Sequence, residues 1–231
     1  MKTGEGWLVF LTGSTLACLG ALAADEGGKG KAEQEPPREL ARLDIANSKE
    51  GSIPGGASVV KGSWAVDAGA KKLVVAAEPL LEGWLEFGPE IREKGASITA
   101  SGRAPGSGRL QSRFGVGLYG RNGFQLRLVP VRQEVELVHR GEVILSRPFP
   151  HDPSQLQQVE LSVRAERQHW IVSGRAWKEG EDRPEDLLFE HKVFAVELLF
   201  PLAGKAVLVA TPFSGEPISF ASAVVTPEKA D

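Results

Sequence analysis

The densest group of potential metal or catalytic ligands lies in the stretch GRAWKEGEDRPEDL, Gly174–Leu187. Its five carboxylates are Glu179, Glu181, Asp182, Glu185 and Asp186. Ca²⁺ prefers about six to eight oxygen ligands, often from alternating carboxylates around a glycine turn. Arg183 and Pro184 interrupt the run, and no D-x-D-x-D-G pattern is present. The stretch therefore favours a solvated hairpin tip, turned at Gly180 and ended by Pro184, and no metal or other cofactor is predicted.

Catalytic carboxylates are the second candidate chemistry. A glycosidase needs two acidic side chains facing each other across the scissile bond, roughly 5–10 Å apart. Glu134 and Glu136 alternate along one expected strand, and Glu160 lies on the polar face of another. With Arg127 and Arg164 as neighbours, they fit cross-strand ion pairs of about 0.2–1 kcal/mol each. The ion pairs are the favoured interpretation, so no catalytic residue is assigned.

Histidine chemistry has little support in the sequence. The four histidines are scattered, without an H-x-H or H-x-x-x-H pair or a cysteine partner, which a zinc site would need. His151 precedes Asp152, a pair that could serve a hydrolase, but no serine stands in a G-x-S-x-G context. No metal or triad is predicted.

The elements that must position these residues are short strands. Apolar residues alternate with polar ones in a dozen segments separated by Gly, Pro, Asn and Asp, and no segment has a convincing helical stripe. The segments are SWAVDA, KLVVAA, GWLEFG, ASITASG, RFGVGLYG, GFQLRLVPV, EVELVHRG, EVILSRPF, QVELSVRAE, HWIVSGRAW, KAVLVATPF and PISFASAVVTP. This pattern predicts an all-β sandwich or barrel.

Alternation also sorts each strand into two faces. One face is apolar; the other is polar and unusually rich in arginine. On the polar faces we expect Tyr119 and Trp177, with Arg113, Arg127 and Arg175 near them in register. Two glycines leave space beside Tyr119. Aromatic rings stack on sugar rings and arginine forks bind hydroxyls or carboxylates, so these five are the candidate ligand-binding residues, although an ordinary solvent-facing sheet would look similar.

A family resemblance rests on four pieces of sequence: an early G-x-W before a strand, the hairpin RFGVGLYGRNGFQLRLVP, the strand HWIVSGRAW running into KEGEDRP, and the closing GEPISF. Over residues 40–228 they resemble concanavalin A-like, laminin-G-like jelly-roll domains. More narrowly, they are similar to the bacterial 3-keto-disaccharide hydrolase domain family and related planctomycete secreted domains. The resemblance implies an antiparallel jelly-roll β-sandwich of about a dozen strands.

One segment departs from that pattern. The last strand of such domains usually reads F-D-[DN]-[IV]-x-V, whereas this chain has Phe220-Ala221-Ser222-Ala223-Val224-Val225. Any role of the family's acidic pair, in calcium binding or in anchoring the strand, is therefore not carried over.

The N-terminus predicts export. Lys2, an apolar run and Ala21-Leu22-Ala23 before Asp25 are typical of a signal peptide, so we expect residues 1–23 to be removed. An uncleaved anchor or a lipidated Cys18 are the alternatives. Residues 24–38 predict a flexible linker and residues 39–228 the β-domain. Cys18 is the only cysteine, so the mature chain would contain no disulfide. A periplasmic, cell-surface or extracellular location follows.

Charge and composition narrow the partners. The net charge of 231 residues is −3, and no Lys/Arg run with interleaved aromatics is present, so no nucleic acid and no membrane partner after cleavage is expected. The leading expectation is an exported, non-catalytic binding or interaction module, with carbohydrate as the ligand class implied by the resemblance. A glycan or modified-disaccharide hydrolase and a structural envelope protein without ligand are the alternatives. Another envelope protein is a second possible partner, and the oligomeric state stays open.

Overall fold

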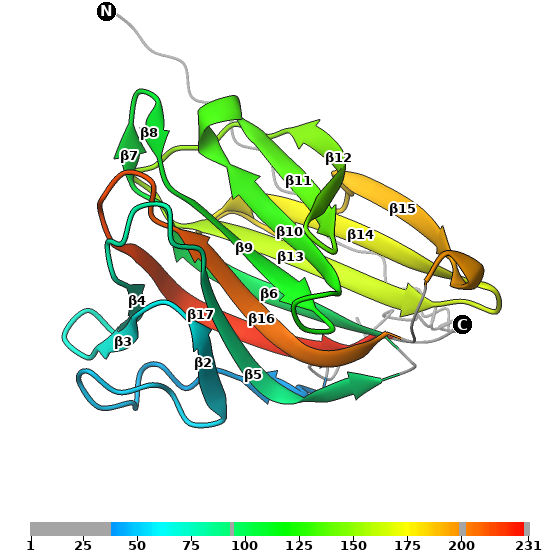
Figure 1. Cartoon of the computed structure of the whole chain (residues 1–231), viewed down its shortest axis with the longest axis horizontal. Coiled ribbons are helices and arrows are strands. Elements are labelled where there is room, and N and C mark those ends of the chain that lie inside the picture. The colour runs from blue at the N-terminus through cyan, green and yellow to red at the C-terminus, as the bar shows by residue number, and fades with distance from the viewer. Residues whose placement is uncertain (1–37, 93–94, 199–201, 229–231) are drawn as a thin grey trace, which may run out of the picture. The chain divides into compact units, whose positions relative to one another are not determined.

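Two antiparallel β-sheets packed face to face make up the described part of the chain (Figure 1). The computed structural model describes residues 38–92, 95–198 and 202–228, which belong to one compact unit, Pro36–Asp231. The other unit is Met1–Glu35, so the expected signal peptide and all but the last residue of the expected linker lie outside the described residues. Within the described ranges, no helix is long and apolar enough to cross a membrane.

The seven-stranded sheet consists of β2 (Ala57–Lys61), β5 (Gly83–Arg92), β9 (Arg113–Leu118), β10 (Phe124–Val129), β11 (Glu134–His139), β12 (Glu142–Pro148) and β16 (Ala203–Thr211). Its order is β12-β11-β10-β9-β16-β5-β2. The eight-stranded sheet consists of β1 (Ala41–Arg42), β3 (Trp64–Asp67), β4 (Lys72–Val75), β6 (Gly95–Arg103), β13 (Gln157–Ala165), β14 (His169–Lys178), β15 (Phe189–Phe194) and β17 (Ile218–Pro227). Its order is β15-β14-β13-β6-β17-β4-β3, with β1 paired to β17. A small hairpin, β7 (Gly106–Ser107) and β8 (Leu110–Gln111), and two 3₁₀ helices, η1 (Pro130–Arg132) and η2 (Ala195–Glu197), lie between the strands.

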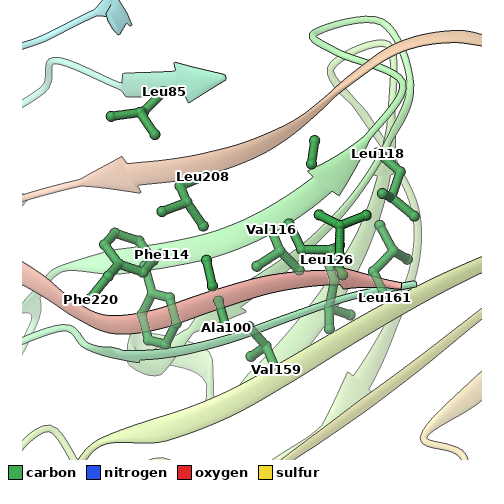
Figure 2. Close-up of a cluster of buried hydrophobic side chains, with 14 of the residues drawn as sticks. Leu85, Ala100, Phe114, Val116, Leu118, Leu126, Val159, Leu161, Leu208 and Phe220 are labelled. Carbon is green, nitrogen blue, oxygen red and sulfur yellow. The ribbon is translucent and has the colours of Figure 1, made fainter. Parts of the chain in front are cut away.

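The core fills the space between the two sheets, as the alternation predicts. Figure 2 shows Phe114 and Leu126 of the seven-stranded sheet together with Leu161 and Phe220 of the eight-stranded sheet, and all four side chains are fully buried. Phe220 contacts both sheets. Its ring meets Phe114 of the seven-stranded sheet edge-on, with 5.5 Å between ring centroids, and stacks with Trp64 of its own sheet, with 5.8 Å between centroids. Large buried aromatic rings of this kind contribute a major share of sandwich stability.

All twelve predicted strand segments are strands in the structure, and the β-sandwich prediction is confirmed. The structure adds five strands that the sequence pattern did not indicate: β1, β7 and β8, of two residues each, and the two longer edge strands β2 and β15. In β2 both Val59 and Val60 are exposed, so the alternation is lost. In β15 only Phe189 and Val193 are buried, between charged residues. Edge strands bury less than central strands, and their sequences therefore carry a weaker period-2 signal.

The turn between β11 and β12 contains two residues. His139 pairs with Glu142, and the two residues between them, Arg140 and Gly141, have φ angles of 53° and 84°. Positive φ at both central positions is the type I′ arrangement, whose twist matches that of the adjoining strands. This tight turn brings Arg140 and Gly141 to the rim of the seven-stranded sheet's outer face.

Candidate functional site

Two positions on the outer face of the seven-stranded sheet, Gly115 and Gly117, have no side chain, so the surface is lower there. A Cβ added to Gly115 would lie 3.1 Å from Cγ of Arg127, and one added to Gly117 would lie 3.0 Å from Cγ of Gln125. The glycines therefore allow both polar side chains to lie across the sheet. The glycines do not leave open space beside Tyr119 as expected, because Arg127, Gln125 and Val207 occupy the surface above them.

Arg127 is the centre of a buried polar network on this surface. Its Nε and Nη2 donate to Oε1 of Gln125 at 2.9 and 2.6 Å, and Nη2 lies 3.2 Å from a carboxylate oxygen of Glu82. The other oxygen of Glu82 accepts a hydrogen bond from the indole Nε1 of Trp84 at 3.1 Å. Trp84 packs with Val207 and Val209 in a small apolar cluster on the same outer face. Burial lowers the pKa of Arg127, and Glu82 opposes that shift.

Arg113 lies one strand away on the same face and is held in a different manner. Its Nε donates to the Thr211 hydroxyl at 3.4 Å, and its guanidinium carbon lies 4.9 Å from the ring centroid of Phe213. No carboxylate of the described residues lies within ion-pair distance of it. Burial lowers its pKa, Glu82 opposes this shift, and Arg132 adds to it. Because an arginine titrates far above neutral pH, the guanidinium stays charged.

Arg132 is the third arginine near this part of the outer face. It sits in η1, and it forms ion pairs with Glu136 and, at 3.1 Å, with Glu134. Pro130 begins η1 with its φ already set for the turn, and Gln133 ends it in the left-handed region at φ 53°. The turn thus places Val131 and Arg132 above the end of the sheet.

Two adjoining hollows open on this outer face. The first, which we name the Phe213 hollow, has a volume of about 440 Å³ and is lined by Gln111, Arg113, Arg127, Val129, Pro130, Val131, Arg132, Glu136, Gly141, Val143 and Phe213. The second, the Trp84 hollow, has a volume of about 400 Å³ and is lined by Glu82, Trp84, Arg121, Asn122, Gln125, Arg127, Arg140 and Gly141. They share Arg127 and Gly141. Both volumes lie in the range of small-ligand sites, and together we call the hollows the groove.

Tyr119 does not lie on the polar face, and that expectation is wrong. The residue follows β9 in the left-handed region at φ 67°, which ends the alternation and turns its side chain into the core, where it is 3% exposed. Its ring meets Trp170 edge-on at 6.1 Å, and burial raises the pKa of its hydroxyl. Tyr119 lines another hollow of about 340 Å³ with His139, Leu198 and Leu202, and this hollow shares Asn122 and Arg140 with the Trp84 hollow.

Arg175 and Trp177 lie on the outer face of the opposite sheet, in β14, so they are not in register with Arg113 and Arg127. The predicted set of five residues is therefore divided among three places. Trp177 is on the polar face, as alternation predicts, but it is only 8% exposed. It is neither an open platform nor part of the groove.

The acidic stretch after Trp177 folds back over that same face. Gly180 turns the chain at φ 87°, as predicted, but the loop is not a free tip. Glu179 accepts a hydrogen bond from Ser101 at 2.9 Å, and Arg183 donates twice to Glu160 at 2.6 Å. Ser101 belongs to β6, two strands from β14, so the loop crosses the sheet.

The carboxylates considered for catalysis lie on two different surfaces. Glu134 and Glu136 pair with Arg132 on one outer face, whereas Glu160 pairs with Arg175 and Arg183 on the other. Of the cross-strand ion pairs expected from the sequence, the structure has one, between Glu160 and Arg175 on neighbouring strands, whereas Glu134 and Glu136 pair locally with Arg132 of η1. In residues 38–92, 95–198 and 202–228, no group of three His, Cys, Asp or Glu side chains could hold a metal ion.

Sequence reasoning missed several residues of the groove. Glu82, Trp84 and Phe213 come from segments that lie far from β9 and β10 in the sequence, and the pairing of β16 between β5 and β9 brings them together. Alternation places Gln125 on the polar face with Arg127, but it does not indicate the hydrogen bonds that Arg127 donates to Gln125. For Trp84, the alternation in GWLEFG was the one available signal: Trp84 precedes the core residue Leu85, so its side chain is expected on the outer face.

The fold defines the class: the chain is a concanavalin A-like jelly-roll sandwich. Solved structures with this fold cover 80–83% of the chain. The carbohydrate recognition domain of Emp47p has a TM-score of 0.56 at 11% identity, covering 82% of this chain and 97% of that one. The Lotus tetragonolobus seed lectin has a TM-score of 0.55 at 6% identity, covering 83% and 99%. Lectin UEA-II, solved with galactose, has a TM-score of 0.52 at 10% identity, covering 80% and 97%. No family model matches the sequence, and no curated protein matches it.

Proposed function

We infer that the protein is an exported carbohydrate-binding domain whose ligand lies in the groove on the outer face of the seven-stranded sheet. The observation that carries this proposal is the groove itself, two adjoining hollows of about 440 and 400 Å³ with arginines and aromatic rings in their walls. Guanidinium and amide groups bind sugar hydroxyls, and apolar surface such as Phe213 and Val143 accepts the C–H faces of sugar rings. The carbohydrate recognition domain of Emp47p and the two lectins have similar folds and are named for carbohydrate binding, which supports the same ligand class.

Export is part of the proposal and rests on the N-terminal sequence alone. Membership of the 3-keto-disaccharide hydrolase domain family also stays a prediction. The carboxylates considered for such an activity, Glu134, Glu136 and Glu160, are bound to arginines on two separate faces. We therefore favour binding without catalysis.

The test blocks the groove without changing its charges. Cys18 is the only cysteine in the chain, so a Cys18→Ser background accepts one new thiol at a chosen place. Val143, which is 52% exposed, lines the Phe213 hollow, and Val143→Cys can be labelled there with a bulky neutral maleimide. The matched control is Glu190→Cys with the same label, because Glu190 is exposed on the outer face of the other sheet.

Both labelled proteins and the unlabelled background are applied to a glycan array, and the strongest ligands are then titrated by calorimetry. Binding by the background and by labelled Glu190→Cys, with loss in labelled Val143→Cys, is the expected result. No glycan bound by any of the proteins would refute carbohydrate binding. Equal binding by both labelled proteins would refute the groove as its location.

A further inference from the structure

The Phe213 hollow carries an excess of positive charge in its lining. Arg113, Arg127 and Arg132 face one carboxylate, that of Glu136, which leaves a formal excess of two positive charges. Two of the three arginines are already bound to carboxylates: Arg127 to Glu82 and Arg132 to Glu136. Arg132 also pairs with Glu134 at 3.1 Å, so these carboxylates balance the three arginines in number, and Arg113 is the arginine of the hollow that has no carboxylate of the described residues within ion-pair distance.

Arg113 is also fixed in position while its terminal nitrogens remain uncommitted. Phe213 lies under the guanidinium at 4.9 Å, and Thr211 accepts only from Nε, at the long distance of 3.4 Å. Within the described part of the chain, no acceptor is hydrogen-bonded to Nη1 or Nη2 of Arg113. A buried or half-buried charge without a counter-ion is costly, and an anionic ligand removes that cost.

We propose that the Phe213 hollow binds an acidic sugar unit, with Arg113 holding its carboxylate or sulfate group. This proposal rests on the proposed carbohydrate-binding function and names the substrate class of the same site. The planar fork of Nη1 and Nη2 matches two oxygens of such an anion, which a neutral hydroxymethyl group cannot offer. Val131 and Val143, each about half exposed, supply apolar wall for the sugar ring beside the anion.

The experiment compares acidic oligosaccharides with neutral counterparts of the same linkage. The probes are oligomers of galacturonate and glucuronate, their methyl esters, and sulfated galactan oligomers with their desulfated forms. They are titrated by calorimetry into the full-length protein at low and high salt. We expect each acidic form that binds to bind about 10- to 100-fold more tightly than its neutral form, and to weaken with salt.

Two variants assign the charge effect to Arg113. Arg113→Gln removes the guanidinium and should abolish the preference for the acidic form, and Arg113→Lys should recover only part of it because lysine lacks the fork. Arg164→Gln is the matched control, since it removes the same formal charge from β13 of the other sheet and should leave affinity unchanged. Thermal unfolding of each variant verifies that it is folded.

The possible results separate this proposal from the one it rests on. A uronate that binds through Arg113 identifies a carboxylate ligand, and a sulfated oligomer that does so identifies a sulfate ligand. Neutral and acidic forms bound equally in the groove would overturn the acidic-sugar proposal and leave carbohydrate binding intact. Acidic binding that persists in Arg113→Gln, or that is lost equally in Arg164→Gln, would also overturn it. The absence of binding to every glycan would overturn both.

Discussion

Glu160 holds together the outer face of the eight-stranded sheet, and removing its carboxylate should cost a large part of the protein's stability. The side chain is 5% exposed and accepts three hydrogen bonds of 2.6 Å, one from Arg175 and two from Arg183. The two arginines differ in exposure: the Arg175 side chain is 15% exposed and that of Arg183 is 53% exposed. Glu160→Ala therefore leaves two arginines without their carboxylate: Arg175, whose charge is largely buried, and Arg183, whose charge water can solvate.

The magnitude follows from that difference. Breaking a buried pair by removing one partner costs about 3–5 kcal/mol, because the remaining charge is left without compensation. The partner Arg183 regains water, so we expect Glu160→Ala to lower the free energy of unfolding by about 3 kcal/mol, at the low end of that range. Arg183→Ala leaves the Arg175–Glu160 pair intact and removes an exposed partner, so it should cost about 1 kcal/mol or less.

Urea unfolding followed by tryptophan fluorescence measures both effects, and Trp177 on the same face is a local reporter. In the double variant, the cost of Arg183→Ala should nearly vanish, because its partner is already gone. A cost below about 1 kcal/mol for Glu160→Ala would refute the reasoning, since the carboxylate would then not be compensating a buried charge. A cost for Arg183→Ala as large as that for Glu160→Ala would refute the role assigned to exposure.

Two further predictions concern packing and pH. Gly174→Ala should lower the free energy of unfolding by about 1–3 kcal/mol, because the added Cβ would lie 2.4 Å from the Phe189 ring. Gly55 has open space around it, so Gly55→Ala should change the free energy of unfolding little in the same urea assay. Burial lowers the pKa of both His139 and His151 below the ordinary 6.5. The unfolded chain then binds more protons than the folded one, so the free energy of unfolding should fall as pH decreases from about 6.5. His151→Phe should reduce this slope, and a slope unchanged in that variant would contradict the assignment.

The central strands were predictable because both of their neighbours enforce the alternation. Phe114, Val116 and Leu118 face the core as their spacing indicates, and the same holds for Val172 and Ala176. Alternation is a property of one strand at a time, however, and it does not say which sheet a strand joins. Arg113 and Arg175 have equivalent positions in their patterns, yet they end on opposite outer faces.

The candidate site was only partly predictable for a related reason. Arg113 and Arg127 were identified from one strand pair, but the groove also needs Glu82 and Phe213, which approach through the pairing of β16. Tyr119 was misplaced because a left-handed residue at the end of β9 breaks the period. Single positive-φ residues that are not glycine are not visible in a hydrophobic pattern.

Both outer faces carry half-buried arginines, but Arg175 is bound to a carboxylate and Arg113 is not, and this difference is the reason that we propose the site on the seven-stranded sheet. On the eight-stranded sheet, Glu160 compensates Arg175, and the returning loop brings Arg183 to it while Trp177 is buried. On the seven-stranded sheet, a hydrogen-bonded network leaves Arg113 without a carboxylate among the described residues and beside an open hollow. A fixed arginine without a carboxylate in a hollow offers a ligand binding free energy that an arginine already bound to a carboxylate does not. Binding should therefore respond to changes on the seven-stranded sheet, and changes at Glu160 should affect stability alone.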